Sequence, residues 1–145
     1  IELLTSGDPE DQVKAAEVSA PKKQFQDMID ELFADTNKKI DRKSNEIQFM
    51  QKMGQGCEVI TPYQLSSGEK QMLAILLTVL VENREPYALL MDEPEISLHI
   101  DWQQRLIDLI RQLNPNAQII LSTHSPALIM DGWMSNVTEV GDIAN

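Results

Sequence analysis

The sequence predicts an α/β fold with a mostly parallel sheet and a small antiparallel hairpin. Two apolar runs, residues 87–91 and 118–122, flank a stretch with helical periodicity, which is the order of a βαβ unit. A serine-rich helix start followed by a long apolar run precedes that unit. Short alternating runs between residues 38 and 60 are typical of antiparallel strands.

Composition limits the classes of function open to the chain. Its 145 residues are 42% hydrophobic, which suits one domain with a core. With 12 basic and 23 acidic residues the net charge is −11, so direct binding to nucleic acid is disfavoured. A single cysteine, Cys57, cannot form an internal disulfide and fits a reducing cytoplasm. The apolar run from Met72 to Val81 is too short to span a bilayer, so we expect a cytoplasmic protein with no membrane partner.

The N-terminal third is predicted to combine a helix with three strands. Residues 1–20 are weakly patterned, and we expect a flexible or partly ordered lead-in there, followed by one lobe over residues 21–145. From Pro21 the apolar residues have helical spacing and predict a helix that packs on a core. Residues 39–42, 47–50 and 57–60 predict a hairpin and a third strand. The apolar stripe of the helix consists of Phe25, Met28, Ile29, Leu32 and Phe33.

A helix start near Ser66 is the first candidate site. Ser66 and Glu69 have the spacing of a capping box before a long apolar run. Several features of this helix start would favour the binding of a phosphate group. They are the free backbone N–H groups, the hydroxyls of Ser66 and Ser67, the positive end of the helix dipole and the absence of a Cβ at Gly68. The alternative interpretation is a well-formed cap with no ligand.

The second candidate site follows residues 87–91, which we expect to form a strand buried on both faces of the sheet. Asp92 and Glu93 come directly after this run and before Pro94. Ligands of open α/β sheets bind outside the carboxyl ends of the strands, where these two carboxylates would lie. The alternative is a surface turn with two solvated acids.

The third candidate site is His124, which follows a second predicted buried strand over residues 118–122. Asp101 is predicted to cap the intervening helix, and a right-handed crossover would make the two strands parallel. His124 and the pair Asp92 and Glu93 would then leave the same edge of the sheet. His99 is treated as an ordinary structural or surface histidine.

The helix between the two strands is predicted to have one apolar face, formed by Trp102, Leu106, Leu109, Ile110 and Leu113. After the second strand we expect a short helix over residues 127–130 and a last strand over residues 136–140.

Together these motifs resemble those of the ABC-type ATPases, in the group that includes SMC, RecF and OLD-like proteins. The segment from Leu65 to Gln71 is similar to the ABC signature loop, and Leu89 to Pro94 to a Walker B strand. Residues 95–101 are similar to the D-loop, and residues 122–126 to the switch-histidine segment. The resemblance implies a P-loop NTPase-like fold, a three-layer α/β/α sandwich, of which this chain would form the C-terminal lobe.

The resemblance also implies roles for these residues. Asp92 would hold Mg²⁺, Glu93 would be the general base, and His124 would contact the γ-phosphate of ATP. The signature residues would address the ATP held by a second copy of the chain, so that two copies enclose two nucleotides. Hydrolysis would release this homodimer. The expected signature contacts come from Leu65, Ser66, Ser67, Gly68 and Glu69.

One family motif is missing from the sequence. No segment matches the phosphate-binding loop G-x-x-x-x-G-K-[ST], which the family places upstream of the signature. We therefore expect the chain to be the C-terminal half of a larger protein and to be inactive alone. A role in DNA maintenance or defence comes from the resemblance, and DNA would be contacted by other parts of the parent protein.

Two alternatives remain open. The first is the nucleotide-binding subunit of an ABC transporter, although Ser67 and Glu69 differ from the usual transporter signature, Leu-Ser-Gly-Gly-Gln. The second is an interaction module that keeps the fold without hydrolysis.

Overall fold

The computed structural model describes residues 9–130 and 132–143, with side chains described from residue 20 onward. The chain divides into two compact units, Ile1–Val59 and Ile60–Asn145. No helix among the described residues has the length and apolarity that crossing a bilayer requires.

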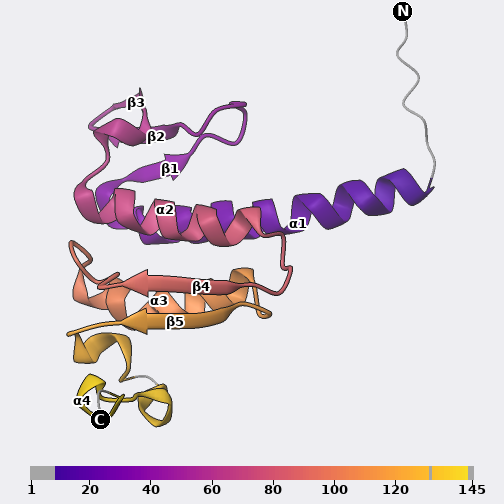
Figure 1. Cartoon of the computed structure of the whole chain (residues 1–145). Helices are drawn as coiled ribbons and strands as arrows, with labels where there is room; N and C mark the ends of the chain where they lie inside the picture. Colours follow the sequence, from indigo (N-terminus) through magenta and orange to yellow (C-terminus); the bar gives the residue numbers. More distant parts are fainter. Residues whose placement is uncertain (1–8, 131, 144–145) are drawn as a thin grey trace, which may run out of the picture. The chain divides into compact units, whose positions relative to one another are not determined.

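The first unit contains one long helix followed by three strands (Figure 1). Helix α1 (Pro9–Leu32) begins earlier than the predicted start at Pro21, which lies inside it. The helix therefore accommodates Pro21 in its interior, although a proline there removes one backbone donor. Residues 1–8 of the predicted lead-in lie outside the described residues. All five side chains of the predicted apolar stripe are buried, which confirms the core-facing helix.

The strands of this unit confirm the predicted hairpin and third strand. A single turn, η1 (Ala34–Thr36), leads into β1 (Lys38–Ile40), β2 (Phe49–Met53) and β3 (Gly56–Ile60). β1 and β2 are antiparallel, with Ile40 paired to Phe49, and β3 lies next to β2.

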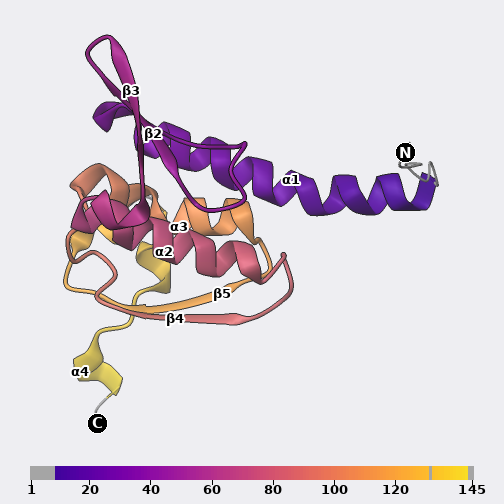
Figure 2. The same ribbon diagram turned by 90° about the horizontal axis from the view of Figure 1, so that it is seen from above.

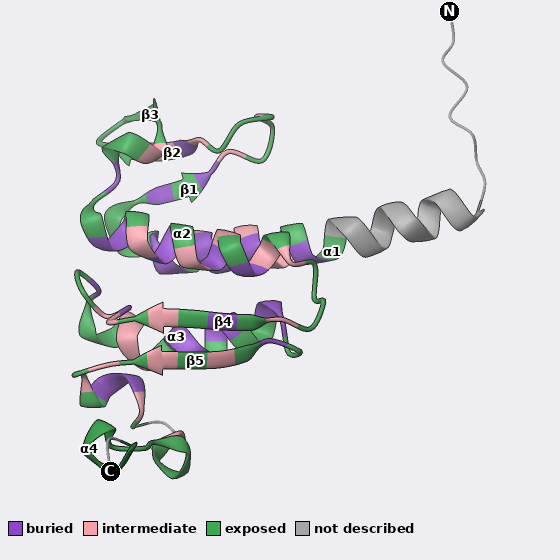
Figure 3. Ribbon diagram, in the orientation of Figure 1, coloured by how far each residue is buried: buried purple, intermediate pink, exposed green. Residues whose placement is uncertain are grey.

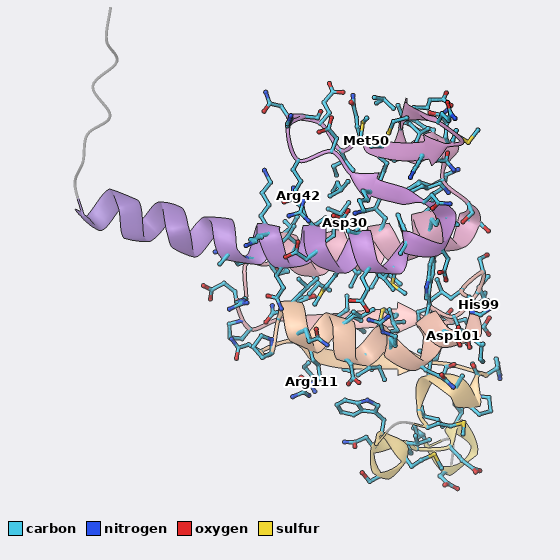
Figure 4. All side chains as sticks on the ribbon, turned by 180° about the vertical axis from the view of Figure 1, so that it is seen from behind. Asp30, Arg42, Met50, His99, Asp101 and Arg111 are labelled. Atoms are coloured by element: carbon cyan, nitrogen blue, oxygen red, sulfur yellow. The ribbon has the colours of Figure 1, made fainter. Side chains whose placement is uncertain are left out.

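Asp30 ties α1 to the end of β1. Its carboxylate accepts a hydrogen bond from the Ile40 N–H at 2.8 Å and forms an ion pair with Arg42, also at 2.8 Å. Arg42 also pairs with Asp27 at 2.6 Å, and Figure 4 shows Arg42 lying over Asp30. These contacts fix where the hairpin leaves the helix.

The second unit contains the predicted βαβ unit and the helix that precedes it. After η2 (Pro62–Gln64), helix α2 (Ser67–Val81) leads to β4 (Ala88–Asp92), α3 (Ile100–Leu113) and β5 (Gln118–Ser122). β4 and β5 are parallel and pair in register from Ala88 with Gln118 to Asp92 with Ser122. The fold class is therefore confirmed as α/β, with one parallel and one antiparallel sheet.

Helices α2 and α3 lie on the same face of the β4 and β5 sheet (Figure 2). Leu89 of β4 points to that face and is 8% exposed. One side of each helix buries its apolar residues, and burial of such surface is the main stabilising term in folding. The buried apolar residues of the two helices are Met72, Leu73, Leu76, Val79, Leu106, Ile107, Leu109, Ile110 and Leu113.

The opposite face of the sheet is open, so the prediction of strands buried on both faces is wrong for this chain (Figure 3). Leu90 is 72% exposed and its neighbour Ile120 is 50% exposed. Apolar composition alone could not show this, because a run without alternation looks the same whether one or two helical layers cover it.

The predicted cap of α3 is also corrected. His99, rather than Asp101, is the N-cap of α3, and its ring nitrogen accepts a hydrogen bond from the Asp101 N–H at 3.4 Å. Figure 4 shows His99 and Asp101 together at this helix start.

The chain after β5 forms short helical turns. The predicted helix at 127–130 is a single turn, η3 (Pro126–Leu128), and η4 (Met134–Asn136) and α4 (Val140–Ile143) replace the predicted strand at 136–140. Val137 and Val140 are exposed, so neither side chain faces a core. Arg111 of α3 lies over the Trp133 ring, 5.4 Å from its centroid.

The two faces of the sheet should differ in their sensitivity to truncation. In the 145-residue chain, Leu106→Ala should lower the free energy of unfolding by about 2 to 5 kcal/mol, because Leu106 is fully buried and a cavity would remain. Leu90→Ala, the same change at an exposed position, should cost less than about 1 kcal/mol. Urea denaturation checks both, and equal losses would contradict the open face.

Candidate active site at the ends of two parallel strands

The candidate site begins where β4 and β5 end together. Asp92 pairs with Ser122 in the register, and the Ser122 hydroxyl donates a short hydrogen bond to Asp92 Oδ1. The N–H of Glu93 donates to the Ser122 carbonyl at 3.0 Å. The ladder therefore extends one residue past the strands and fixes the backbone of Glu93.

Glu93 and His124 are brought together by this pairing. His124 Nε2 lies 3.3 Å from Glu93 Oε1, as the common sheet edge predicts. Their side chains are 89% exposed for His124 and 40% exposed for Glu93, so both are open to a ligand or to water. Glu93 has a φ of 44°, a left-handed conformation that turns the chain sharply after β4.

Glu95 forms a second connection between the same two loops. Its Oε1 accepts hydrogen bonds from the Thr123 hydroxyl at 2.6 Å and from the His124 N–H at 2.9 Å. Burial raises the pKa of the Glu95 carboxyl, but hydrogen bonds from Thr123 and backbone amides outweigh it, so the net pKa lies below the ordinary value. Glu95 is therefore a carboxylate at neutral pH.

The segment after His124 is also tied to α3. The Ser125 N–H donates to Thr123 Oγ1 at 2.9 Å, and the Ser125 hydroxyl donates to Gln103 Oε1 at 2.6 Å. The Gln103 amide in turn donates to the Leu98 carbonyl at 3.0 Å. These bonds hold residues 123–125 against the start of α3.

The predicted capping box at the start of α2 is confirmed. Ser66 Oγ accepts from the Glu69 N–H at 3.2 Å, and Glu69 Oε2 accepts from the Ser66 N–H at 2.8 Å. Glu69 is 1% exposed and Leu65 is 4% exposed, so these two shape the helix start. Ser66 and Ser67 are exposed and accessible to a ligand.

Gly68 packs against the loop that follows β4. A Cβ at Gly68 would overlap the carbonyl oxygen of Ser97, a residue with a φ of 71°. Glycine is therefore required by the close approach of α2 to this backbone. The loop that begins at Glu93 therefore contacts the start of α2 at Gly68, and this contact links the two candidate sites.

The donor set at Asp92 fits a magnesium ion that is held mainly by a nucleotide. Among the described residues, no group of three or more His, Cys, Asp or Glu side chains is placed to hold a metal. Mg²⁺ commonly uses one or two carboxylates together with phosphate oxygens and water, so a lone exposed Asp92 beside the Ser122 hydroxyl suits it.

Comparison with known proteins assigns the chain to a family. The profile of the family described as "AAA domain, putative AbiEii toxin, Type IV TA system" matches residues 5–131. The chain belongs to this AAA-domain family. This match supports the resemblance to the SMC and ABC-like group of ATPases that the sequence motifs indicate.

Curated relatives of this AAA-domain chain include two larger bacterial proteins. The retron Vc95 probable ATPase of Vibrio cholerae is 36% identical over 81 residues, which cover 48% of this chain and 16% of that protein. The Septu protein PtuA of Bacillus thuringiensis is 38% identical over 53 residues, or 37% of this chain and 13% of that protein. The chain therefore spans only a small part of the length of these relatives.

A solved structure has the same fold as this AAA-domain chain. It comes from work titled "Structural biochemistry of ATP-driven dimerization and DNA stimulated activation of SMC ATPases" and superposes with a TM-score of 0.52. The match covers 81% of this chain and 75% of that chain at 18% identity, a level that shows the fold alone.

The structure adds Glu95, Ser122 and Thr123 to the residues that sequence analysis singled out. Ser122 and Thr123 continue the second strand into its terminal loop, and a polar residue at that position was a visible signal. Glu95 was included only as part of the D-loop-like segment 95–101, and its contacts were not predicted because its partners lie 28 and 29 residues away in the chain.

Gly68→Ala should destabilise the chain because the added methyl group has no space beside the Ser97 carbonyl. We expect a loss of about 1 to 3 kcal/mol in the free energy of unfolding, measured by urea denaturation. Gly141→Ala is the matched control, since nothing lies within 4 Å of a Cβ there. Equal stability of the two variants would contradict the close packing of α2 on the loop.

Proposed function

We propose that this chain carries the water-activating half of an ATPase active site and the helix start that completes the site of a second copy. The observation that carries the proposal is the Glu93 and His124 pair at 3.3 Å, beside Asp92 at the ends of two parallel strands. An acid and a histidine at this edge can act together on one water molecule.

Asp92 is the proposed ligand of Mg²⁺, which supplies charge neutralisation at the phosphates of bound ATP. Ser122 fixes one oxygen of the carboxylate by its hydrogen bond, which restricts the direction of the other oxygen. The nucleotide's own phosphates would supply further ligands, in keeping with a site that has one protein carboxylate.

Glu93 is the proposed general base. Its carboxylate is partly exposed and would accept the proton of the attacking water. The His124 imidazole, 3.3 Å away, would donate from Nε2 toward Glu93 or toward a phosphate oxygen, and so hold the base in place beside the attacking water. Fixed backbone positions on both sides keep this pair at working distance.

The α2 start is proposed to bind the γ-phosphate of ATP held by a second copy of the chain. Ser66 and Ser67 are exposed, and the helix dipole favours an anion, while the buried Gly68 lets the helix start approach the Ser97 carbonyl closely. Leu65 and Glu69 are buried and would act by holding the turn in shape. This arrangement makes ATP the bridge of a homodimer.

The biological setting is proposed to be DNA maintenance or defence in the cytoplasm. The support is the likeness to a retron probable ATPase and a Septu protein, together with the fold shared with SMC ATPases. The net charge of −11 argues that any DNA contact is made by other parts of the full-length protein.

Glu93→Gln in the full-length protein should reduce steady-state ATP hydrolysis by at least about 100-fold, because an amide cannot take the proton of the water. ATP binding should persist, so a dimer should accumulate with Mg-ATP. Phosphate release and light scattering after size-exclusion chromatography measure the two effects.

Glu139→Gln is the matched control, since this exposed glutamate lies near α4 and should leave both measurements unchanged. Undiminished turnover in Glu93→Gln would remove Glu93 from the mechanism. Loss of hydrolysis without an ATP-dependent dimer would count against nucleotide-driven association.

The isolated 145-residue chain should bind Mg-ATP weakly and hydrolyse none of it, because its sequence has no G-x-x-x-x-G-K-[ST] loop to hold the β- and γ-phosphates. Isothermal titration calorimetry should give a dissociation constant above about 100 μM, on the order of −5 kcal/mol or weaker. A submicromolar site would mean that the main phosphate contacts are made within these residues.

A further inference from the structure

We propose that Glu95 is a positioning residue that sets the distance between the base Glu93 and His124. The inference rests on the proposed function of that pair. Glu95 itself points at no reacting group, and it acts through the backbone of His124 and the hydroxyl of Thr123.

Two connections flank the reactive pair. On one side, the Glu93 N–H donates to the Ser122 carbonyl at 3.0 Å. On the other, Glu95 Oε1 accepts from the His124 N–H at 2.9 Å. The loop after β4 and the loop after β5 are thus joined both before and after the Glu93 and His124 side chains, which leaves their relative position little freedom.

The backbone position of His124 has unusual influence on its imidazole. The side chain is 89% exposed, so packing contributes little to its orientation. The hydrogen bonds that hold the backbone of residues 123–124 therefore largely determine the position of His124 Nε2. Glu95 provides that hold from the opposite loop, 29 residues away in the chain.

The chemistry of the contact favours a carboxylate. One oxygen of Glu95 accepts two hydrogen bonds, and charge-assisted bonds of this kind are roughly twice as strong as neutral ones. Thr123 Oγ1 accepts from the Ser125 N–H, which directs its own hydrogen toward Glu95. A glutamine would place an amide group in the same space, where Glu95 Oε2 is buried without a partner among the described residues.

Thr123 offers the sharper test because its hydroxyl and its methyl group can be removed separately. Thr123→Val removes the hydroxyl and keeps the shape, whereas Thr123→Ser keeps the hydroxyl. Glu95→Gln tests the acceptor directly. Thr138→Val and Glu139→Gln are matched exposed controls in the C-terminal segment.

The experiment measures ATP hydrolysis by the full-length protein against ATP concentration. Thr123→Val and Glu95→Gln should lower kcat by about 10- to 100-fold, since a misplacement near 1 Å costs that much, and leave KM for ATP within about twofold. The kcat of Thr123→Ser and of both control variants should stay within about threefold of the kcat of the wild-type protein.

A second measurement separates positioning from simple loss of structure. In a His124→Ala background, adding Glu95→Gln should change the single-turnover rate by less than about twofold, because the group that Glu95 positions is gone. A full effect in that background, or a kcat as low in Thr123→Ser as in Thr123→Val, would overturn the proposal.

The outcome for Glu93→Gln keeps the two proposals distinct. If Glu93→Gln abolishes turnover while Glu95→Gln and Thr123→Val leave kcat unchanged, the proposed function stands and the positioning role is wrong. If Glu93→Gln turns over normally, the proposed function fails whatever the Glu95 variants show.

Discussion

The structure depends on one constraint, the parallel in-register pairing of β4 and β5. The two strands lie 30 residues apart in the sequence, yet the ladder matches Asp92 to Ser122 at its end. Parallel strands end at the same edge of the sheet, so the loops that follow them lie side by side. The acid, the histidine and their supporting hydrogen bonds all follow from that alignment.

The loop after β4 converts this alignment into a site. Glu93 and Ser97 have positive φ values of 44° and 71°, which for residues with a Cβ carry a cost of about 1 to 2 kcal/mol each. Glu93 turns its side chain out beside His124, and the Ser97 carbonyl meets α2 where only glycine fits, at Gly68. One short segment thereby shapes both candidate sites.

The open sheet face is a consequence of where the helices lie. With α2 and α3 on one side, Leu89 is buried while Leu90, the next residue, is exposed. The apolar layer between these helices and the sheet therefore provides much of the buried surface of this unit. The site at the sheet edge does not require the second face to be covered, because its hydrogen bonds run between the two terminal loops.

The sequence by itself determined the order of the elements and most of the candidate site. Local signals carry those predictions: the capping box of Ser66 and Glu69 acts over three residues, and Asp92 and Glu93 directly follow an apolar run. It misjudged the burial of β4, which depends on neighbours distant in the chain, and also the cap of α3 and the C-terminal strand. Only the tertiary structure decided that Glu95 contacts Thr123 and His124, because which carboxylate meets which amide depends on strand register and loop conformation, and no local pattern encodes either.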